Sequence, residues 1–146
     1  MFEEVIILEK YKTSSYEETY KLAGEFVKTL KENDIVLLNG DLGAGKTCFT
    51  NGMLYAIGFS QGGSSPTFTI VNQYPSNPKI NHFDLYRITD EDELYEIGFL
   101  EYLTDGSINI IEWPVNAFSL LEGYKTIKVN ISFTDIDDER IITIER

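Results

Sequence analysis

The segment DIVLLNGDLGAGKTCFT, residues 34–50, constrains the fold of this chain more than any other. Its first seven residues are almost all apolar and end in glycine, which is typical of a strand buried on both faces of a parallel sheet. Residues 40–47 match the pattern G-x-x-x-x-G-K-[ST], and helix-forming residues then continue to about Ile57, before Gly58. This order of strand, glycine-rich loop and helix predicts a phosphate-binding loop, or P-loop.

The residues of the loop give the chemical reason for this prediction. Gly40 and Gly45 let backbone N–H groups converge on a β-phosphate, and the N-terminus of the following helix adds a favourable dipole. In this pattern Lys46 bridges the β- and γ-phosphates, and the hydroxyl of Thr47 ligates Mg²⁺. We therefore expect ATP or ADP to bind here with Mg²⁺. The expected nucleotide contacts are Asp41, Leu42, Gly43, Ala44, Gly45, Lys46, Thr47 and Cys48.

Two acidic residues stand where a P-loop enzyme needs a carboxylate. Hydrolysis requires an acid at the end of a buried strand to hold the metal ion, directly or through water, and a group that orients the attacking water. Asp84 closes the run INHFD, and Glu112 closes the more uniformly apolar run INIIE. Each also has an ordinary interpretation as a solvated carboxylate at a strand end. With Lys46, they are the catalytic candidates, and we expect at least one to serve the metal ion.

Four further residues near these acids admit more than one interpretation. Thr67 and Thr69 lie where a nucleotide-sensing segment is common in this fold, although threonine is also a strand former. His82 is the only histidine, and its apolar neighbours favour a hydrogen-bonded structural group over a catalyst. Trp113 follows Glu112, so it either packs in the core, covers the nucleotide or faces a partner.

The remaining pattern predicts an α/β, P-loop NTPase-like fold in one domain, residues 1–146, with a mixed, mostly parallel central sheet flanked by helices. Beyond the P-loop segment, the expected strands are residues 3–10, 67–74, 79–88 and 107–112, with two more around an acidic turn in 124–146. We expect 67–74 and 79–88 to form a hairpin. The expected helices are 14–33, with a serine cap, 89–103, capped by Thr89, and a short one in 115–123.

The charge of the chain argues against direct contact with nucleic acid. It carries 24 Asp and Glu against 12 Lys and Arg, a formal net charge of -12. Surfaces that bind RNA or DNA show clustered basic residues, because phosphate neutralisation supplies most of the affinity. Here the basic residues are scattered, so a polyanion would require a local positive site or a basic partner protein.

The sequence also points to the cytoplasm. The N-terminal run MFEEVIILEK contains acids and lacks the basic start of a signal peptide, and no apolar run approaches the length of a membrane span. The single cysteine allows no intramolecular disulfide, which fits a reducing compartment.

Four short stretches stand in order along the chain: GDLGAGKT, SSPTFTIVNQY, HFDLYR and IIEWP. Together they resemble the TsaE (YjeE-type) family, small bacterial P-loop ATPases that support threonylcarbamoyladenosine modification of tRNA. The resemblance extends over almost the whole chain, since its length and the order of its elements also fit. P-loops occur in many families, whereas SPTFT followed by HFDLYR and EWP is quite specific.

The resemblance implies a compact fold that binds ATP or ADP with Mg²⁺ and hydrolyses ATP weakly alone. It also implies two protein partners, TsaB and TsaD. In that family, TsaD transfers the threonylcarbamoyl group to adenosine 37 of tRNAs that read codons beginning with A, and TsaE resets the complex between turnovers. Contact with tRNA would be indirect, which agrees with the acidic charge, and no DNA or membrane is implied.

The same resemblance assigns roles to matching positions. Lys46 holds phosphate, and Trp113 matches a tryptophan near the nucleotide or the partner surface. Thr67 belongs to a switch-like segment. The residues implied to serve the metal ion and the water are Thr47, Thr67, Asp84 and Glu112.

Two other functions use the same loop. A nucleotide-binding scaffold would assemble partners without productive hydrolysis, and a small-molecule kinase would transfer the phosphoryl group to a metabolite. The kinase lacks support because the chain has only three arginines, too few for an arginine-rich lid. The absence of the guanine signature N-K-x-D favours ATP over GTP.

Overall fold

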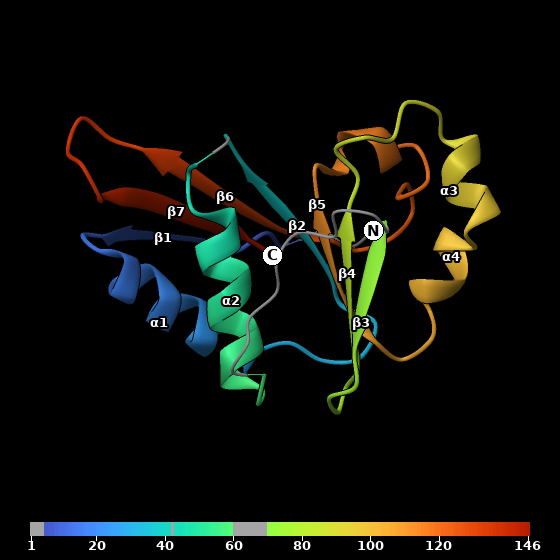
Figure 1. The fold of residues 1–146 in the computed structure, drawn as a ribbon, viewed down its shortest axis with the longest axis horizontal. Helices are drawn as coiled ribbons and strands as arrows, with labels where there is room; N and C mark the ends of the chain where they lie inside the picture. The colour runs from blue at the N-terminus through green and yellow to red at the C-terminus, as the bar shows by residue number, and fades with distance from the viewer. Residues whose placement is uncertain (1–4, 42, 60–69) are drawn as a thin grey trace.

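The computed structural model describes residues 5–41, 43–59 and 70–146. These residues build one seven-stranded sheet in the order β1-β7-β6-β2-β5-β4-β3 (Figure 1). The four central strands β6, β2, β5 and β4 run parallel to one another, while β1, β7 and β3 pair antiparallel with their neighbours. The strands are Leu8–Thr13 (β1), Ile35–Gly40 (β2), Val71–Tyr74 (β3), Ile80–Asp84 (β4), Ile108–Glu112 (β5), Ile127–Phe133 (β6) and Arg140–Glu145 (β7).

Helices cover both faces of the sheet. The helices are Tyr16–Val27 (α1), Lys46–Ala56 (α2), Asp92–Glu96 (α3), Phe99–Tyr102 (α4) and the 3₁₀ helix Pro114–Ala117 (η1). Alternate residues of β2 enter different core clusters, because successive side chains of a strand point to opposite faces. Leu38 packs in the cluster that contains Phe49 of α2, while Leu37 packs in the cluster that contains Phe99 of α4. No helix in the described part of the chain has the length and apolarity needed to cross a bilayer.

The predicted fold class is confirmed. The apolar run before the P-loop is β2, an interior strand with its first four residues buried, and the helix that follows begins at Lys46. The predicted hairpin is β3–β4, and the predicted C-terminal strand pair is β6–β7. The predicted serine cap of the first helix is Ser15, whose side chain accepts a hydrogen bond from the Glu18 N–H at 3.1 Å.

Two N-terminal elements differ from their predicted bounds. Of the strand expected at residues 3–10, residues 3 and 4 lie outside the described residues, and β1 runs from Leu8 to Thr13 because it follows the register of its partner β7. The helix expected at residues 14–33 ends at Val27. For the strand expected at 67–74, β3 covers Val71–Tyr74, and residues 67–69 lie outside the described residues.

The single helix predicted at residues 89–103 is wrong. The segment forms two short helices, α3 and α4, because Gly98 between them adopts a left-handed backbone with φ of 72°. Thr89 is not the N-cap: Glu91 takes that position, and the Thr89 N–H donates to the Glu93 carboxylate at 3.1 Å. The helix predicted in residues 115–123 is the 3₁₀ helix η1, followed by turns.

Candidate active site

The predicted P-loop connects the end of β2 at Gly40 to the start of α2 at Lys46. Gly43 and Gly45 have φ of 80° and 117°, a region that side chains rarely adopt. At Gly40 the constraint is space, because a Cβ there would lie 2.9 Å from the carbonyl oxygen of Ile131 in β6. Each of these glycines therefore allows a backbone conformation or a close backbone contact that a residue with a Cβ would hinder.

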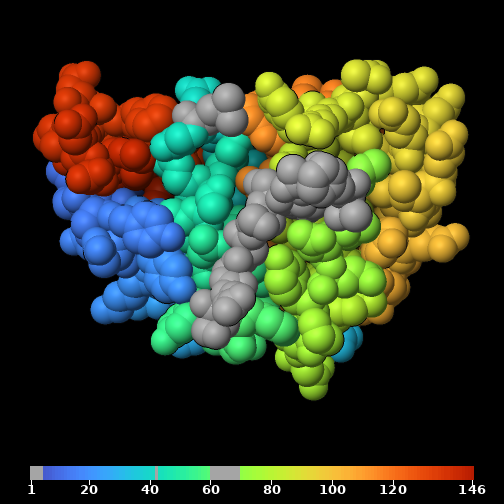
Figure 2. All heavy atoms as spheres, in the orientation of Figure 1, coloured from blue at the N-terminus to red at the C-terminus, as the bar shows by residue number. Residues whose placement is uncertain are grey.

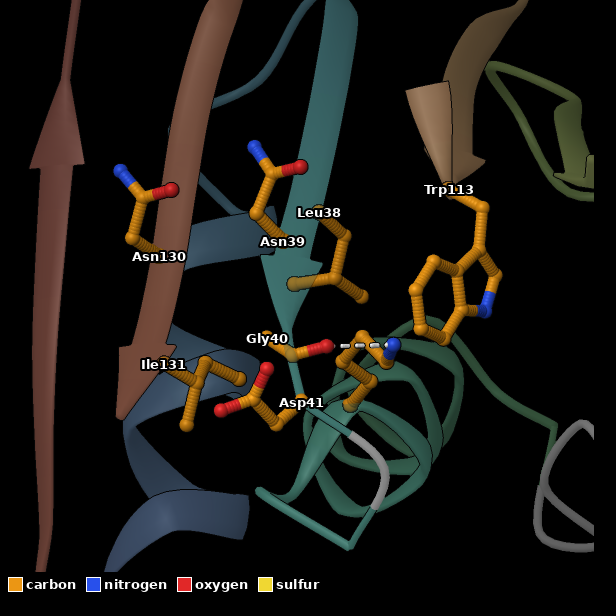
Figure 3. A pocket seen from close by; sticks show the side chains of 8 residues that line it. Leu38, Asn39, Gly40, Asp41, Trp113, Asn130 and Ile131 are labelled. Carbon is orange, nitrogen blue, oxygen red and sulfur yellow. Dashed lines mark hydrogen bonds between the residues drawn. The ribbon is translucent and has the colours of Figure 1, made fainter. Parts of the chain in front are cut away.

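Lys46, the first residue of α2, is buried with 7% of its surface exposed. Its Nζ donates to the carbonyl oxygen of Gly40 at 2.6 Å and lies 3.6 Å from the centre of the Trp113 ring (Figure 3). Burial lowers the pKa of Lys46, while the nearby carboxylates of Glu112 and Asp84 partly offset that effect. The loop thus places a positive charge in a partly buried site. An anion bound there interacts with that charge more strongly than it would in water.

The two candidate acids lie side by side at the ends of parallel strands. Asp84 is paired with Glu112 in the β4–β5 register, so both carboxylates belong to the same edge of the sheet. Asp84 is half-buried, and its Oδ1 accepts a hydrogen bond from the Tyr86 N–H at 3.1 Å. Glu112 is buried, with 3% exposed.

His82, a buried residue of β4, makes a side-chain hydrogen bond with Glu112. Its Nε2 lies 2.5 Å from Glu112 Oε2, and His82 is only 1% exposed. The other ring nitrogen, Nδ1, is buried without a hydrogen-bond partner among the described residues. A neutral imidazole that donates from Nε2 satisfies this arrangement, since it leaves no N–H unpaired. The prediction of a hydrogen-bonded structural histidine fits, but its partner is the candidate catalytic acid.

Trp113 lies between the P-loop and the segment after β4. Its ring contacts the Lys46 ammonium on one side and packs against Tyr86 with ring centroids 4.9 Å apart. Its backbone has φ of 56°, a strained conformation for a bulky residue, directly before Pro114 begins η1. The side chain is half-buried, so it is a wall of the site and not a core residue.

A pocket of about 410 Å³ joins these residues. The predicted site residues that line it are Gly43, Gly45, Lys46, Thr47, Cys48, Asp84, Glu112 and Trp113. Asp41 lines instead a second hollow of about 300 Å³, which also borders Lys46 and Trp113 (Figure 3). Ala44 is buried below the loop surface, and Leu42 and Thr67 lie outside the described residues.

Comparison with known proteins assigns the family. A profile for "Threonylcarbamoyl adenosine biosynthesis protein TsaE" matches residues 13–142. This chain belongs to the TsaE family. The TsaE protein of Rickettsia conorii is 44% identical over 133 residues, which are 90% of this chain and 74% of that protein. The Bacillus subtilis TsaE protein is 38% identical over 105 residues, 71% of this chain and 65% of that protein.

A solved structure agrees with this assignment. The crystal structure of Bacillus subtilis YdiB matches with a TM-score of 0.76 and 28% identity, over 98% of this chain and 88% of that one. The predicted family is therefore confirmed, and with it a role in tRNA threonylcarbamoyladenosine biosynthesis.

The TsaE-family pocket offers donors that fit Mg²⁺. Thr47 is exposed and lines the pocket together with Asp84 and Glu112, and its hydroxyl and their carboxylates are the hard oxygen ligands that Mg²⁺ prefers. No group of three or more His, Cys, Asp or Glu side chains in the described part of the chain could hold a metal ion by itself.

Cys48 is a buried residue that lines the pocket, and its thiol has low reactivity. Its Sγ contacts the carbonyl oxygen of Tyr16 at 3.4 Å, and burial raises the pKa of the thiol to about 11. The thiol is therefore protonated at neutral pH, and its function is packing between α2 and α1.

Three residues of the pocket were missed by the sequence analysis. Tyr16 is 54% exposed and lines the pocket, as do Tyr86 and Arg140. Arg140 is the first residue of β7, and its Nε donates to the Ala44 carbonyl of the P-loop at 2.8 Å. No local pattern marks Tyr16 or Arg140, because only the strand order brings them to the P-loop.

Proposed function

We propose that this TsaE-family chain is a cytoplasmic, Mg²⁺-dependent ATPase that acts on a complex of TsaB and TsaD and so supports modification of adenosine 37 in tRNA. The observation that carries the proposal is that one pocket is lined both by the P-loop residues Lys46 and Thr47 and by the strand-end acids Asp84 and Glu112. A phosphate cradle alone would support binding. The two carboxylates beside it support hydrolysis.

Lys46 supplies the positive charge for the β- and γ-phosphates. In the structure its Nζ donates to the Gly40 carbonyl, so it must rotate from that oxygen towards the nucleotide. The loop N–H groups and the N-terminus of α2 bind the remaining phosphate oxygens. Thr47 would hold Mg²⁺, which would supply positive charge for the transferred phosphoryl group.

Glu112 and Asp84 have different roles in the proposed reaction. Glu112 has one oxygen held by His82, and its other oxygen is available to orient the attacking water at the γ-phosphate. Asp84, half-buried at the neighbouring strand end, serves the metal ion directly or through water. Trp113 covers Lys46 and keeps bulk water from that side of the phosphates.

Release of phosphate from Mg·ATP, by this chain alone and with purified TsaB and TsaD, tests the proposal. We expect slow hydrolysis alone and strong stimulation by the partners. Lys46→Ala should lower the partner-stimulated rate on the order of a hundredfold, as removal of a preorganised charge contact does. Lys31→Ala, at an exposed position outside the pocket, is the matched charge control.

Two results would contradict the proposal. Unchanged ATP affinity and turnover in Lys46→Ala would remove the P-loop as the site. Assembly with the partners in ATP, with phosphate release at background in every protein, would favour the scaffold function instead.

A further inference from the structure

The P-loop packs against the end of β6 at three of its glycines. A Cβ added to Gly40 would lie 2.9 Å from the carbonyl oxygen of Ile131, and one added to Gly45 would lie 3.8 Å from Ile131 Cγ2. A Cβ added to Gly43 would lie 3.8 Å from the ring of Phe133, the last residue of β6. In Figure 2 the red C-terminal segment accordingly lies beside the teal segment that contains the loop and the start of α2. The β6–β7 pair therefore supports one side of the loop.

Arg140, the first residue of β7, adds a hydrogen bond to the loop backbone. Its Nε donates to the carbonyl oxygen of Ala44 at 2.8 Å. The guanidinium is itself held in place, because Nη1 donates to the Glu139 carbonyl at 2.8 Å and Cζ lies 4.8 Å from the centre of the Phe133 ring. A hydrogen bond from an ionised donor is roughly twice as strong as one between neutral groups. Arg140 therefore fixes the direction of the Ala44 carbonyl.

The direction of this carbonyl sets the direction of the next N–H group. Ala44 and Gly45 are joined by a planar trans peptide group, in which the C=O and N–H bonds point in opposite directions. Because the carbonyl points to Arg140, the N–H of Gly45 points the other way. Backbone N–H groups of the glycine-rich segment are what a P-loop uses to bind phosphate, and Gly45 lines the main pocket. The hydrogen bond also polarises the peptide group, which makes its N–H a better donor.

The glycines on either side of Ala44 explain why an external contact is needed. Glycine accepts many backbone conformations, so the peptide groups beside Gly43 and Gly45 rotate at low cost. Such a rotation would turn the Gly45 N–H away from a ligand. Lys46 does not supply the contact, because its Nζ donates to the Gly40 carbonyl and must leave that oxygen to reach a phosphate.

We propose that Arg140 is a positioning residue of the P-loop, which acts through the Ala44 carbonyl to direct the Gly45 N–H at the bound phosphates. The proposal rests on the proposed function, because it concerns the same phosphate site. It makes Arg140 a determinant of affinity for the phosphate groups themselves, so ADP and pyrophosphate depend on it equally. The N–H donor at the Nε position carries the effect, and the positive charge alone does not.

Two substitutions of Arg140 separate this hydrogen bond from the rest of the side chain. In Arg140→Gln, Nε2 occupies the place along the side chain that Nε has in arginine, so an N–H donor is retained without the charge. Arg140→Met has a methyl group at that place and no donor. Arg146→Met is the matched control, because the Arg146 guanidinium also lies over an aromatic ring, 5.5 Å from that of Phe26, but outside the pocket.

Calorimetric titration of Mg·ADP and of magnesium pyrophosphate into the wild type and these three variants tests the proposal. We expect Arg140→Met to weaken both ligands about tenfold, in line with the loss of one hydrogen bond from a charged group. Arg140→Gln should stay within about threefold of the wild type, because a neutral hydrogen bond is weaker but present. Arg146→Met should match the wild type for both ligands.

Thermal unfolding confirms that each variant is folded. If Arg140→Met does not fold, Arg140→Lys takes its place with the same expected loss, because it keeps the charge and has a methylene group where arginine has Nε.

Other outcomes separate this inference from the proposed function. Wild-type affinity in Arg140→Met, or a tenfold loss in Arg140→Gln, would overturn the positioning role and leave the P-loop assignment intact. Loss of ADP affinity without loss of pyrophosphate affinity would also overturn it, because Arg140 would then act on the nucleoside and not on the phosphate groups. Failure of the wild type to bind either ligand would overturn both this inference and the proposed function.

Discussion

At the scale of single residues, the buried contact between His82 and Glu112 decides which carboxylate oxygen faces the pocket. Oε2 accepts from His82, so Oε1 remains for a ligand or a water. Both side chains are almost fully buried, and neither can change rotamer without losing a hydrogen bond in a dry environment. Groups that orient a site residue in this way are often worth a factor of about 10 to 100 in activity.

We therefore predict that His82→Leu lowers partner-stimulated ATP hydrolysis by about 10- to 100-fold while Mg·ADP binding stays near wild type. His82→Gln, whose amide can still donate towards Glu112, should recover part of the rate. Phosphate release and calorimetry measure the two effects, with thermal unfolding to confirm folding. Equal loss of rate in the Leu and Gln variants, or full activity in the Leu variant, would contradict an orienting role.

The same scale shows what a linear pattern can predict in this site. Lys46 and Thr47 belong to a local motif, and Asp84 and Glu112 each close an apolar strand, so their positions follow from short stretches of sequence. Arg140 is 96 residues from Ala44, its partner in the P-loop. That contact depends on the strand order, which local periodicity does not encode.

At the scale of elements, the close packing of α1 on α2 orients the first turn of α2. A Cβ added to Gly52 would collide with the Tyr20 carbonyl of α1 and would lie 3.0 Å from the Ala23 Cβ. The backbone of α1 at this carbonyl cannot move aside for the added Cβ as a flexible side chain could. Gly52 is therefore required by the distance between the two helices, even though glycine disfavours a helix interior.

We predict that Gly52→Ala lowers the free energy of unfolding by about 2 kcal/mol, since overpacking of a tight contact exceeds the gain in helix propensity. Gly24→Ala is the graded control, because its Cβ would meet the Ala56 Cβ at 3.3 Å and the Gly52 carbonyl oxygen at 3.5 Å, and these longer contacts should cost less. Urea unfolding measures both. If Gly52→Ala were as stable as Gly24→Ala, backbone contact would not set the helix spacing.

Element boundaries were less predictable than element types, for reasons visible in the packing. The segment expected as one helix splits at Gly98, where a left-handed backbone replaces a helical one. Helical spacing alone tolerates one glycine at a cost of about 1 kcal/mol, so the break is invisible in the pattern. Burial of Leu94, Phe99 and Leu103 in one core cluster decides the final course of the chain.

At the scale of the whole molecule, the net charge is -12, and many of the few basic side chains already have partners within the described residues. Lys46 is buried, and Arg140 donates to two backbone carbonyls. Several other basic side chains lie within ion-pair distance of an acid, namely Lys12–Glu139, Lys79–Asp105, Lys128–Glu145 and Arg146–Glu9. Binding of a polyanion depends mainly on clustered, unpaired cations. These ion pairs reduce the number of unpaired cations among the described residues.

We therefore propose that this TsaE-family chain takes part in tRNA modification without holding the tRNA. We predict that the isolated chain does not bind fluorescently labelled tRNA in an anisotropy titration, even at about 50 mM salt, where phosphate contacts are strong. A complex of TsaB and TsaD, titrated in the same buffer, is the positive control. Micromolar binding by the isolated chain, weakening steeply with added salt, would mean that its few basic residues converge on a phosphate-binding surface. Its contribution to the modification would then include direct contact with the RNA, in addition to the nucleotide chemistry of the P-loop.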